Sequence, residues 1–272
     1  MTATLTVNTI QLLRSPRQIA ETLYEDERVI IRYTPGTSPR GVCVFADLPE
    51  MWGGAGDSGL ADAVWTAAGS MHRFEIIDRR GTWFNECFNT VYAVLKSACT
   101  RNDIHSLMML GEGMGGYGAM LFLDALPRAH RGAAFNLPSS VHPDRVSFEH
   151  RWSPLRQRIK RWAAPCLTER WSRKELYLFF GSEAQEDTLH ADRLQPLLGD
   201  GQMLYHLEGY GADLIRDIQA RGQLAATLEA LFARSSVDAR LSAAFEADLV
   251  TEEHFDDMIT EQFAAVSMKA AK

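Results

Sequence analysis

The sequence has few cysteines and no long hydrophobic run, and both absences limit what the protein can be. Its 272 residues include four cysteines, none of them in a Cys-x-x-Cys pair. That spacing is typical of zinc and redox sites, so we predict no metal site and expect reduced, buried thiols. No stretch reaches the roughly 18–20 apolar residues that span a bilayer, and the N-terminus lacks a secretory-signal pattern. We therefore expect a soluble, cytoplasmic protein with no membrane span.

Positive charge is also in deficit. The chain has 28 Lys and Arg against 35 Asp and Glu, a formal net charge of -7 at pH 7. This balance argues against nucleic acid as a partner. No motif requires a cofactor, and nothing indicates the oligomeric state. A hydrophobic content of 46% is enough for one large core.

Short apolar runs alternate with helical patterns along most of the chain. The runs cover residues 29–33, 42–46, 74–77, 107–110, 133–137, 176–180 and 203–207, and residues 4–7 could add an edge strand. Helices are expected over residues 16–25, 83–99, 114–126, 188–198 and 213–233, with two more at 237–247 and 252–268. This alternation predicts an α/β fold with a mainly parallel central sheet and helices on both faces.

A glycine-rich turn stands between an apolar strand and a helix in residues 105–126. The segment Gly111-Glu112-Gly113-Met114-Gly115 has the frame of the Gly-x-Ser-x-Gly nucleophile elbow, with glycine where the serine would be. It resembles the α/β-hydrolase superfamily, and within it esterases and acyl hydrolases whose elbow reads Gly-x-Ser-Met-Gly-Gly-x-x-Ala. The resemblance implies a single-domain α/β-hydrolase fold in which Gly113 is the vacant nucleophile position.

The same resemblance implies an acid after the next-to-last strand and a histidine after the last. Asp187 matches the acid, whereas Ala212, in Gly209-Tyr-Gly-Ala-Asp, stands where the family has Gly-x-Gly-His-Asp. In a triad the serine is a weak nucleophile until the histidine removes its proton, and the acid only orients the histidine. Asp187 alone therefore cannot sustain ordinary esterase turnover.

Further pocket residues follow from neighbouring segments. In the family, the loop at residues 47–52 and the residue after the nucleophile supply the oxyanion-hole amides, here Asp47 and Met114. Asp78 and Trp83 resemble an Asp-x-x-x-x-Trp-Tyr segment of a bacterial branch, where it shapes one pocket wall; the alternative is a helix cap with a core aromatic anchor. A carboxylate at Glu112 could act on a water in the serine's place, although this side chain normally points away from the mouth.

Residues 139–174 are rich in arginine and tryptophan and lie where this fold inserts a cap or lid. One interpretation is a basic, aromatic cover, including Trp152, that recruits an anionic or glycan ligand. The other is a solvated helical face with tryptophans packed beneath it, since arginine stems often cover apolar surface.

The predicted organisation is a hydrolase-like domain over residues 1–235, containing the 139–174 insertion, and a C-terminal helical extension over 236–272. The amphipathic stretches of the extension either cover apolar surface of the domain or bind a protein partner.

The glycines also allow a second interpretation. Gly111-x-Gly113-x-x-Gly116 satisfies the dinucleotide fingerprint, which would indicate a nucleotide-binding oxidoreductase. The fingerprint normally follows the first strand of its unit, however, and at least four candidate strands precede Gly111. The acidic ribose ligand expected about 20 residues further on is also missing.

We therefore predict a catalytically impaired hydrolase-like protein, a pseudoenzyme with a binding, scaffolding or accessory role. The resemblance extends to bacterial proteins associated with surface-glycan or secretion pathways, and the expected ligand is small and polar, acyl or glycan-like. Two alternatives remain open. One is a serine ester or acyl hydrolase captured as an inactive Ser/His variant, and the other is a different chemistry in the old pocket.

Overall fold

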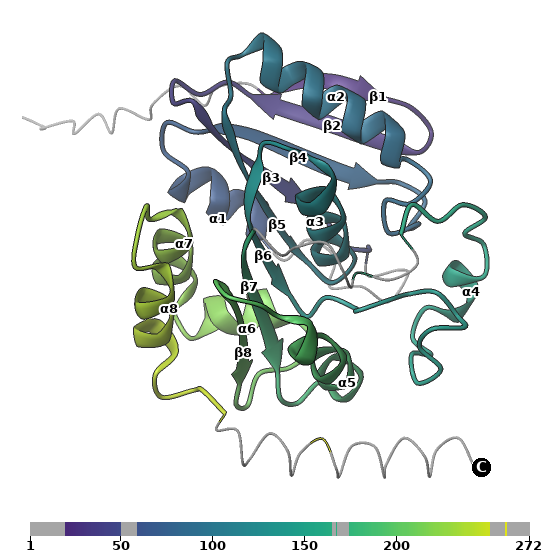
Figure 1. The fold of residues 1–272 in the computed structure, drawn as a ribbon, viewed down its shortest axis with the longest axis vertical. Coiled ribbons are helices and arrows are strands. Elements are labelled where there is room, and N and C mark those ends of the chain that lie inside the picture. The colour runs from purple at the N-terminus through teal and green to yellow at the C-terminus, as the bar shows by residue number, and fades with distance from the viewer. Residues whose placement is uncertain (1–19, 50–58, 165–166, 168–173, 251–258, 260–272) are drawn as a thin grey trace, which may run out of the picture.

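The protein is built around an eight-stranded sheet of order β1-β2-β4-β3-β5-β6-β7-β8 (Figure 1). The computed structural model describes residues 20–49, 59–164, 167, 174–250 and 259. Strand β2 runs antiparallel to both of its neighbours, and the pairs from β4 to β8 are parallel. The mainly parallel sheet is thus confirmed. The strands are β1 Glu21–Glu25, β2 Val29–Thr34, β3 Arg40–Phe45, β4 His72–Asp78, β5 Ser106–Glu112, β6 Ala129–Phe135, β7 Glu175–Gly181 and β8 Gln202–Leu207.

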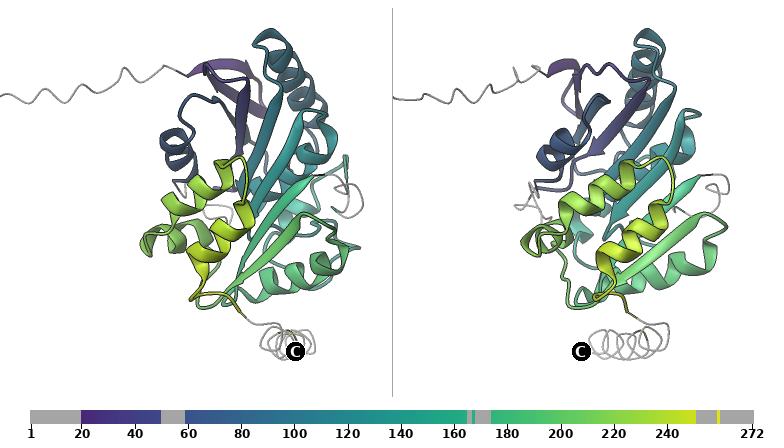
Figure 2. Two further views of the ribbon diagram at one scale, coloured as in Figure 1. Left: turned by 60° about the vertical axis from the view of Figure 1, so that its left-hand side comes forward. Right: turned by 90° about the vertical axis from the view of Figure 1, so that its left-hand side faces the viewer.

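Helices cover both faces of the sheet, as Figures 1 and 2 show. Alternate residues of each strand point to opposite faces, so that in β3 Cys43 and Phe45 join one core cluster and Val42 and Val44 the other. The first cluster includes α2 Phe88–Arg101, α3 Gly113–Ala125 and α5 Gln185–Leu194. The second includes α1 Leu60–Ala67, α6 Leu214–Ala220, α7 Leu224–Phe232 and α8 Val237–Phe245.

The helix predicted over residues 16–25 is wrong where the structure describes it, because residues 21–25 form strand β1. The Asp26 carboxylate accepts the N–H groups of Arg28 and Val29, each at 2.8 Å, and this closes a tight turn. The turn folds β1 back onto β2 as an antiparallel pair. Pairing with a neighbouring strand has overridden the local helical signal.

Other helix boundaries differ from the predicted ones. Helix α2 begins at Phe88 rather than at residue 83, and the helix expected over residues 213–233 is split into α6 and α7 around Gly222, whose φ is +76°. Helix α5 begins at Gln185 and is followed by a short 3-10 helix, η2 Gln195–Leu197. Helix α1 has no counterpart among the predictions. The predicted elements at residues 4–7 and 252–268 lie outside the described residues.

The described part of the C-terminal extension covers the sheet. Helix α8 packs its buried Val237, Leu241 and Phe245 into the same core as α7. The chain then follows the end of β8, where Glu208 N–H donates to the carbonyl of Asp248 and Leu249 bridges Leu207. This part of the extension therefore covers apolar surface, as one of the two predicted roles requires.

Helix α3 lies unusually close to β3. A Cβ atom built on Gly115 would lie 2.0 Å from the carbonyl oxygen of Phe45, which is rigid backbone. A Cβ on Gly111 would lie 2.2 Å from the carbonyl carbon of Gly115. Glycine is required at both positions because the backbone segments touch.

We expect the substitution Gly115→Ala to lower the free energy of unfolding by about 1–3 kcal/mol, because the new methyl group overpacks the contact with β3. The higher helix propensity of alanine, worth roughly 1 kcal/mol, offsets only part of this loss. Urea unfolding measures the change. The matched control is Gly199→Ala, where a Cβ meets nothing within 4 Å; equal effects of the two substitutions would contradict the packing argument.

Candidate functional site

The turn from β5 into α3 forms at the carboxyl edge of the parallel strands. Gly113 is the first residue of α3 and has a φ of +53°, in the left-handed region that favours glycine. Glu112 before it is extended, and Met114 after it is buried within the helix. This geometry is the strand-turn-helix arrangement that a nucleophile elbow requires. At the tip, however, the residue has no side chain.

The carboxylate of Asp47 occupies the space next to Gly113. A Cβ atom built on Gly113 would lie 2.5 Å from Asp47 Oδ1. The same oxygen accepts the backbone N–H of Met114 at 2.6 Å. Asp47 follows β3 and is half-buried. The structure thus brings together the two residues predicted for the oxyanion hole, but Asp47 contributes an accepting carboxylate to the amide of Met114.

A carboxylate is well placed at this point. Helix α3 has 13 residues, and the N-terminus of a helix carries a partial positive charge and free N–H groups. An oxyanion hole would offer the same N–H to the negative oxygen of a reaction intermediate. The Asp47 carboxylate therefore accepts, from within the chain, the hydrogen bond that this amide could donate to a negative oxygen of a substrate.

Asp187 lies in the first turn of α5, after β7, and is 1% exposed. Its Oδ1 accepts a hydrogen bond from Arg151 Nη2 at 2.6 Å. Burial raises the pKa of Asp187, against the opposing effect of the Arg151 charge. The predicted acid is thus a buried carboxylate whose hydrogen-bond partner is an arginine.

Ala212 lies in the exposed connection between β8 and α6. Its carbonyl and that of Gly211 accept hydrogen bonds from Asn136 Nδ2 at 3.1 and 2.9 Å. The Oδ1 of Asn136 accepts the N–H of Gly181 at 3.0 Å. One asparagine therefore ties together the ends of β6 and β7 and the loop after β8, and so holds the position of Ala212 at the carboxyl edge.

Glu112 is directed toward α6. It is 2% exposed, and its Oε1 accepts the N–H of Ile215 in the first turn of that helix at 2.8 Å. A carboxylate at a helix N-terminus satisfies a backbone donor and the helix dipole together. This contact gives Glu112 a role in joining β5 to α6.

Asp78 organises the loop between β4 and α2. Its carboxylate accepts hydrogen bonds from the N–H and hydroxyl of Thr82 and from the N–H groups of Arg80 and Phe84, at 2.7–2.9 Å. This turn places Trp83 and Phe84 at positive φ, 51° and 60°, which is why α2 begins later than predicted. The Asp78 carboxylate is thus engaged within its own loop.

Trp83 and Trp152 form a buried aromatic pair. Their ring centroids are 5.4 Å apart, and the guanidinium of Arg151 lies 4.3 Å from the ring centre of Trp152. Trp83 is 0% and Trp152 6% exposed, so little ring surface is open to a ligand. Among the described residues, the buried indole N–H of Trp83 has no hydrogen-bond acceptor. The pair acts as core beneath the insertion.

The described part of the predicted cap, residues 139–164, is mostly loop, with one short helix, α4 Ser153–Arg156. Arg156 is 3% exposed and donates to the carbonyls of Val141 and Glu149. The Tyr117 hydroxyl donates to the carbonyl of Ala164, which fixes the segment to α3. Other cations of the segment are exposed: Arg145, Arg158, Lys160 and Arg161.

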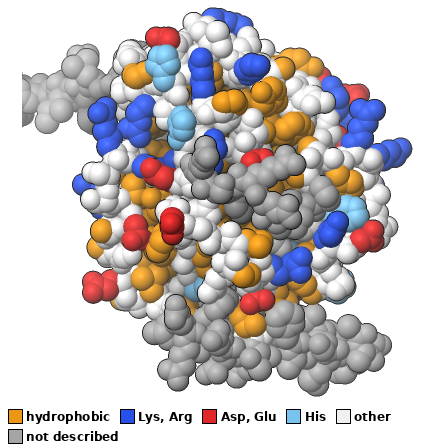
Figure 3. All heavy atoms as spheres, viewed as in Figure 1, with side chains coloured by type: hydrophobic (Ala, Val, Ile, Leu, Met, Phe, Trp, Pro, Cys, Tyr) orange, Lys and Arg blue, Asp and Glu red, His pale blue; other side chains and the backbone are white. Residues whose placement is uncertain are grey.

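Lys and Arg side chains form no single basic surface on the face shown in Figure 3. On that face Lys and Arg side chains lie among acidic and hydrophobic ones. In the described insertion Trp152 and Arg156 are buried and Trp162 and Arg151 are partly buried, whereas the four cations named above are exposed. This agrees with tryptophans packed beneath a solvated surface, although that surface is mostly loop, and recruitment of a ligand stays a prediction.

A polar network that sequence reasoning missed attaches the insertion to α5. The backbone N–H and the hydroxyl of Ser139 lie 3.1 and 2.9 Å from His190 Nδ1. His190 Nε2 lies 3.1 Å from Glu149 Oε2, and that oxygen also accepts from Arg151 at 2.6 Å. Arg151 in turn contacts Asp187. These residues come from three distant segments, and only the spacing of Asp187 and His190, one helical turn apart, could have indicated them.

The network contains a serine, a histidine and an acid, but it is built for structure. Because the Ser139 N–H donates to Nδ1, the ring carries its hydrogen on Nε2 and donates it to Glu149. Ser139 and Glu149 are 1% and His190 0% exposed, so no substrate reaches them. Burial lowers the pKa of His190 and keeps the ring neutral. Burial alone would raise the pKa of Glu149, but hydrogen bonds from His190 and Arg151 lower it to about 2.

Among the residues described, no three His, Cys, Asp or Glu side chains gather where a metal ion could bind. Cys43, Cys87 and Cys99 are free and buried, as expected for core thiols, and burial raises the pKa of Cys99 to about 11. Cys166 lies outside the described residues. In the part of the chain that the structure describes, no helix is both long and apolar enough to cross a bilayer.

We expect acid to weaken the fold through this network. The pKa of Glu149 is lower in the folded protein than its ordinary 4.5, so its stabilising contribution is full above pH 4.5 and is lost as the pH falls toward 2. The pKa of His190 is lowered from 6.5, so its contribution to stability is also lost as the pH falls below 6.5. The pKa of Asp187 is raised, so this residue has the opposite effect and favours the folded state as the pH falls. Urea unfolding between pH 7 and pH 3 measures the slope.

The substitution Glu149→Gln tests the same network. Removing the charge of this buried carboxylate leaves Arg151 with Asp187 as one carboxylate partner in place of two, so we expect a loss of roughly 3–5 kcal/mol at pH 7 and a flatter slope below pH 4.5. The control is Glu27→Gln, whose side chain is 74% exposed in its ion pair with Arg80. That substitution should cost less than about 1 kcal/mol. Similar losses in both variants would show that the network contributes nothing special.

Comparison with known proteins supports the fold by structure and not by sequence. No family model matches the chain, and no curated protein matches it. The esterase domain of a Rhodothermus marinus protein aligns with a TM-score of 0.51 at 14% identity, over 82% of this chain and 97% of that one. Thermogutta terrifontis esterase 2, solved phosphonylated by sarin, aligns with a TM-score of 0.55 at 14% identity, over 78% and 93%.

A third similar structure comes from a complex. It is the glycosylation-associated protein (Gap123) complex of Streptococcus agalactiae, with a TM-score of 0.53 at 12% identity, over 77% of this chain and 45% of that one. Identities this low establish the fold alone. Together with the strand order and the elbow turn, they show that the chain has a single-domain α/β-hydrolase fold.

Proposed function

We propose that the chain is a pseudoenzyme, an α/β-hydrolase-fold protein whose former catalytic edge serves binding or scaffolding. The observation that carries the proposal is the contact at the elbow. Gly113 supplies no nucleophile, and the Asp47 carboxylate fills the adjacent space while accepting the Met114 N–H at 2.6 Å.

This contact opposes ester hydrolysis on electrostatic grounds. Acyl transfer through a tetrahedral intermediate needs N–H donors aimed at the developing negative oxygen. Here the Met114 donor already holds a carboxylate, and a second negative charge beside it would be repelled. A substrate carbonyl would first have to displace Asp47. The Met114 amide therefore binds the Asp47 side chain in the place where a substrate oxygen would have to bind.

The other two triad positions support the same proposal. Ala212 has no imidazole to remove a proton, and Asp187 is held by Arg151. The arginine is locked in turn by Glu149 and stacks on Trp152. Asp187 is thus part of a structural network, in which an arginine takes the place that a histidine has in a triad.

The contact also weighs against two alternatives. In a captured Ser/His variant of an active hydrolase, restoring a side chain at Gly113 would rebuild the site, yet its Cβ would lie 2.5 Å from Asp47 Oδ1. In a dinucleotide-binding protein, the pyrophosphate would sit at this helix N-terminus, where Asp47 places a negative charge.

For the biological role we favour an accessory function in a complex, within a glycan-related pathway. One structurally similar protein belongs to a glycosylation-associated complex. The buried Trp83 and Trp152 leave little surface for glycan stacking, while the exposed cations of the insertion remain available to an acidic partner. The C-terminal extension beyond α8 is the second candidate surface for a protein partner.

The test is hydrolysis of short-chain p-nitrophenyl esters together with fluorophosphonate labelling. We expect neither turnover nor labelling in the unmodified chain. The double variant Gly113→Ser with Ala212→His should label weakly, because Asp47 still competes for the amide. Adding Asp47→Ala should raise labelling about a hundredfold or more, the usual value of one oxyanion-hole donor.

Two controls make the result decisive. Asp47→Ala alone should fold, as judged by circular dichroism, and should not label, because no nucleophile is present. If the folded triple variant does not label, our placement of Gly113 and Ala212 fails. Ester turnover by the unmodified chain that is abolished in Asp47→Asn would overturn the pseudoenzyme proposal and make Asp47 the reacting group.

A further inference from the structure

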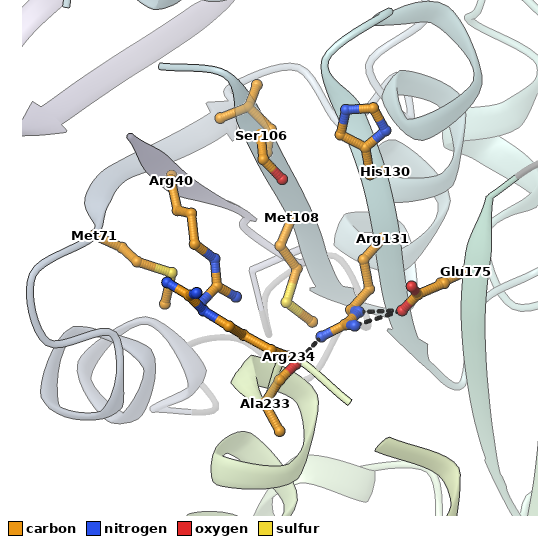
Figure 4. A pocket seen from close by; sticks show the side chains of 11 residues that line it. Arg40, Met71, Ser106, Met108, His130, Arg131, Glu175, Ala233 and Arg234 are labelled. Atoms are coloured by element: carbon orange, nitrogen blue, oxygen red, sulfur yellow. Dashed lines mark hydrogen bonds and ion pairs between the residues drawn. The ribbon is translucent and has the colours of Figure 1, made fainter. Parts of the chain in front are cut away.

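A second candidate site lies at the opposite end of the sheet from Gly113. A cavity of about 220 Å³ is formed where β3, β5, β6 and β7 begin, and the connection between α7 and α8 closes one side of it (Figure 4). We refer to it as the amino-edge cavity. Its lining includes three arginines, Arg40, Arg131 and Arg234, and a single carboxylate, Glu175.

Arg131 is held rigidly on one side of the cavity. Its Nε and Nη2 contact Glu175 Oε2 at 2.6 and 2.5 Å. Its Nη1 donates to the carbonyls of Leu231 and Ala233 at 2.7 and 2.6 Å, at the end of α7. The Glu175 carboxylate and the carbonyl groups at the end of α7 therefore engage all three nitrogen atoms of the Arg131 guanidinium.

The positive charges of the other two arginines, Arg40 and Arg234, are not neutralised by such a pair. Arg40 donates one hydrogen bond, from Nη2 to the carbonyl of Phe232 at 3.0 Å. Among the described residues, neither Arg40 nor Arg234 has a carboxylate within ion-pair distance. In Figure 4 their guanidinium groups point into the same part of the cavity. Burial lowers the pKa of Arg40, and the like charges of Arg131 and Arg234 lower it further.

The balance in the cavity is therefore three positive charges against one negative, on a chain whose net charge is -7. Apolar side chains, among them Met71 and Met108, share the lining and strengthen the field of these charges. The segments that supply the arginines are far apart in sequence. Arg40 and Arg234 converge without a carboxylate partner among the described residues, and a dianion would neutralise their charges.

We propose that the amino-edge cavity binds a phosphate group, held by Arg40 and Arg234 on the side opposite the Arg131–Glu175 pair. Guanidinium groups recognise phosphate through paired N–H donors, and Arg40 retains donors beyond its bond to Phe232. The volume is below the usual 300–1,000 Å³ of sites for drug-sized ligands, which favours inorganic phosphate or a small phosphomonoester. This site is independent of the proposed loss of catalysis.

The experiment is a calorimetric titration of the full chain with inorganic phosphate, at constant ionic strength maintained with sodium chloride. We expect saturable binding that chloride does not reproduce. Arg234→Gln should weaken the affinity about tenfold or more, and because Arg234 is exposed this variant should fold. Arg193→Gln, the same charge change at an exposed position on α5, should leave the affinity unchanged.

A parallel titration with glucose 6-phosphate distinguishes the sources of the phosphate group. Tighter binding than that of inorganic phosphate would identify a phosphorylated small molecule as the ligand, and weaker binding would identify free phosphate; both support the site. Absence of phosphate binding would overturn the proposal. Binding that Arg234→Gln leaves intact would overturn it as well, because the anion would then sit elsewhere.

Discussion

The contact between α3 and β3 governs the geometry of the carboxyl edge. Gly115 lies against the carbonyl of Phe45, and Gly111 lies against Gly115, so the chain must turn sharply between β5 and α3. That turn puts Gly113 at positive φ and directs the Met114 N–H toward the loop that follows β3. Because the backbones touch, no side chain can relax this arrangement. The sharp turn is thus fixed by packing, with glycine at its tip.

Several other polar groups at this edge bind partners within the chain. Asp47 accepts the Met114 amide, Asp187 pairs with Arg151, and Asn136 joins three strand ends. Buried charges without partners are costly, whereas paired and hydrogen-bonded ones are tolerated. In this protein these groups make internal contacts, which stabilise the arrangement of the edge.

The two ends of the sheet consequently differ in electrostatic character. At the carboxyl edge, acidic groups are matched by an amide, an arginine and a histidine from the same chain. At the amino edge, Arg131 is matched by Glu175 and by the end of α7, while Arg40 and Arg234 keep their charges unbalanced among the described residues. The unbalanced end is where binding of an external anion would lower the free energy.

Short apolar runs along the chain were sufficient to predict seven strands, β2 to β8. Successive apolar residues of β3, β5 and β7 join opposite core clusters, because successive side chains of a strand point to opposite faces. The strand β1 could not be found this way, since it is half-exposed at the sheet edge and is defined by its pairing with β2. The start of α2 depended likewise on the hydrogen bonds of Asp78, a side-chain contact without a periodic signal.

The sequence by itself determined the strands β2 to β8, most of the helices between them, the glycine-packed turn at residues 111–116 and the identity of the residues at its tip. These are local properties, set by apolar period and by the steric freedom of glycine. Only the tertiary structure decided that the Asp47 side chain fills the place beside Gly113, that Arg151 holds Asp187, and that three arginines meet at the amino edge. Asp47 and Met114 are 67 residues apart and Arg151 and Asp187 are 36 apart. Such contacts follow from how packed elements place side chains in space, which no local pattern encodes.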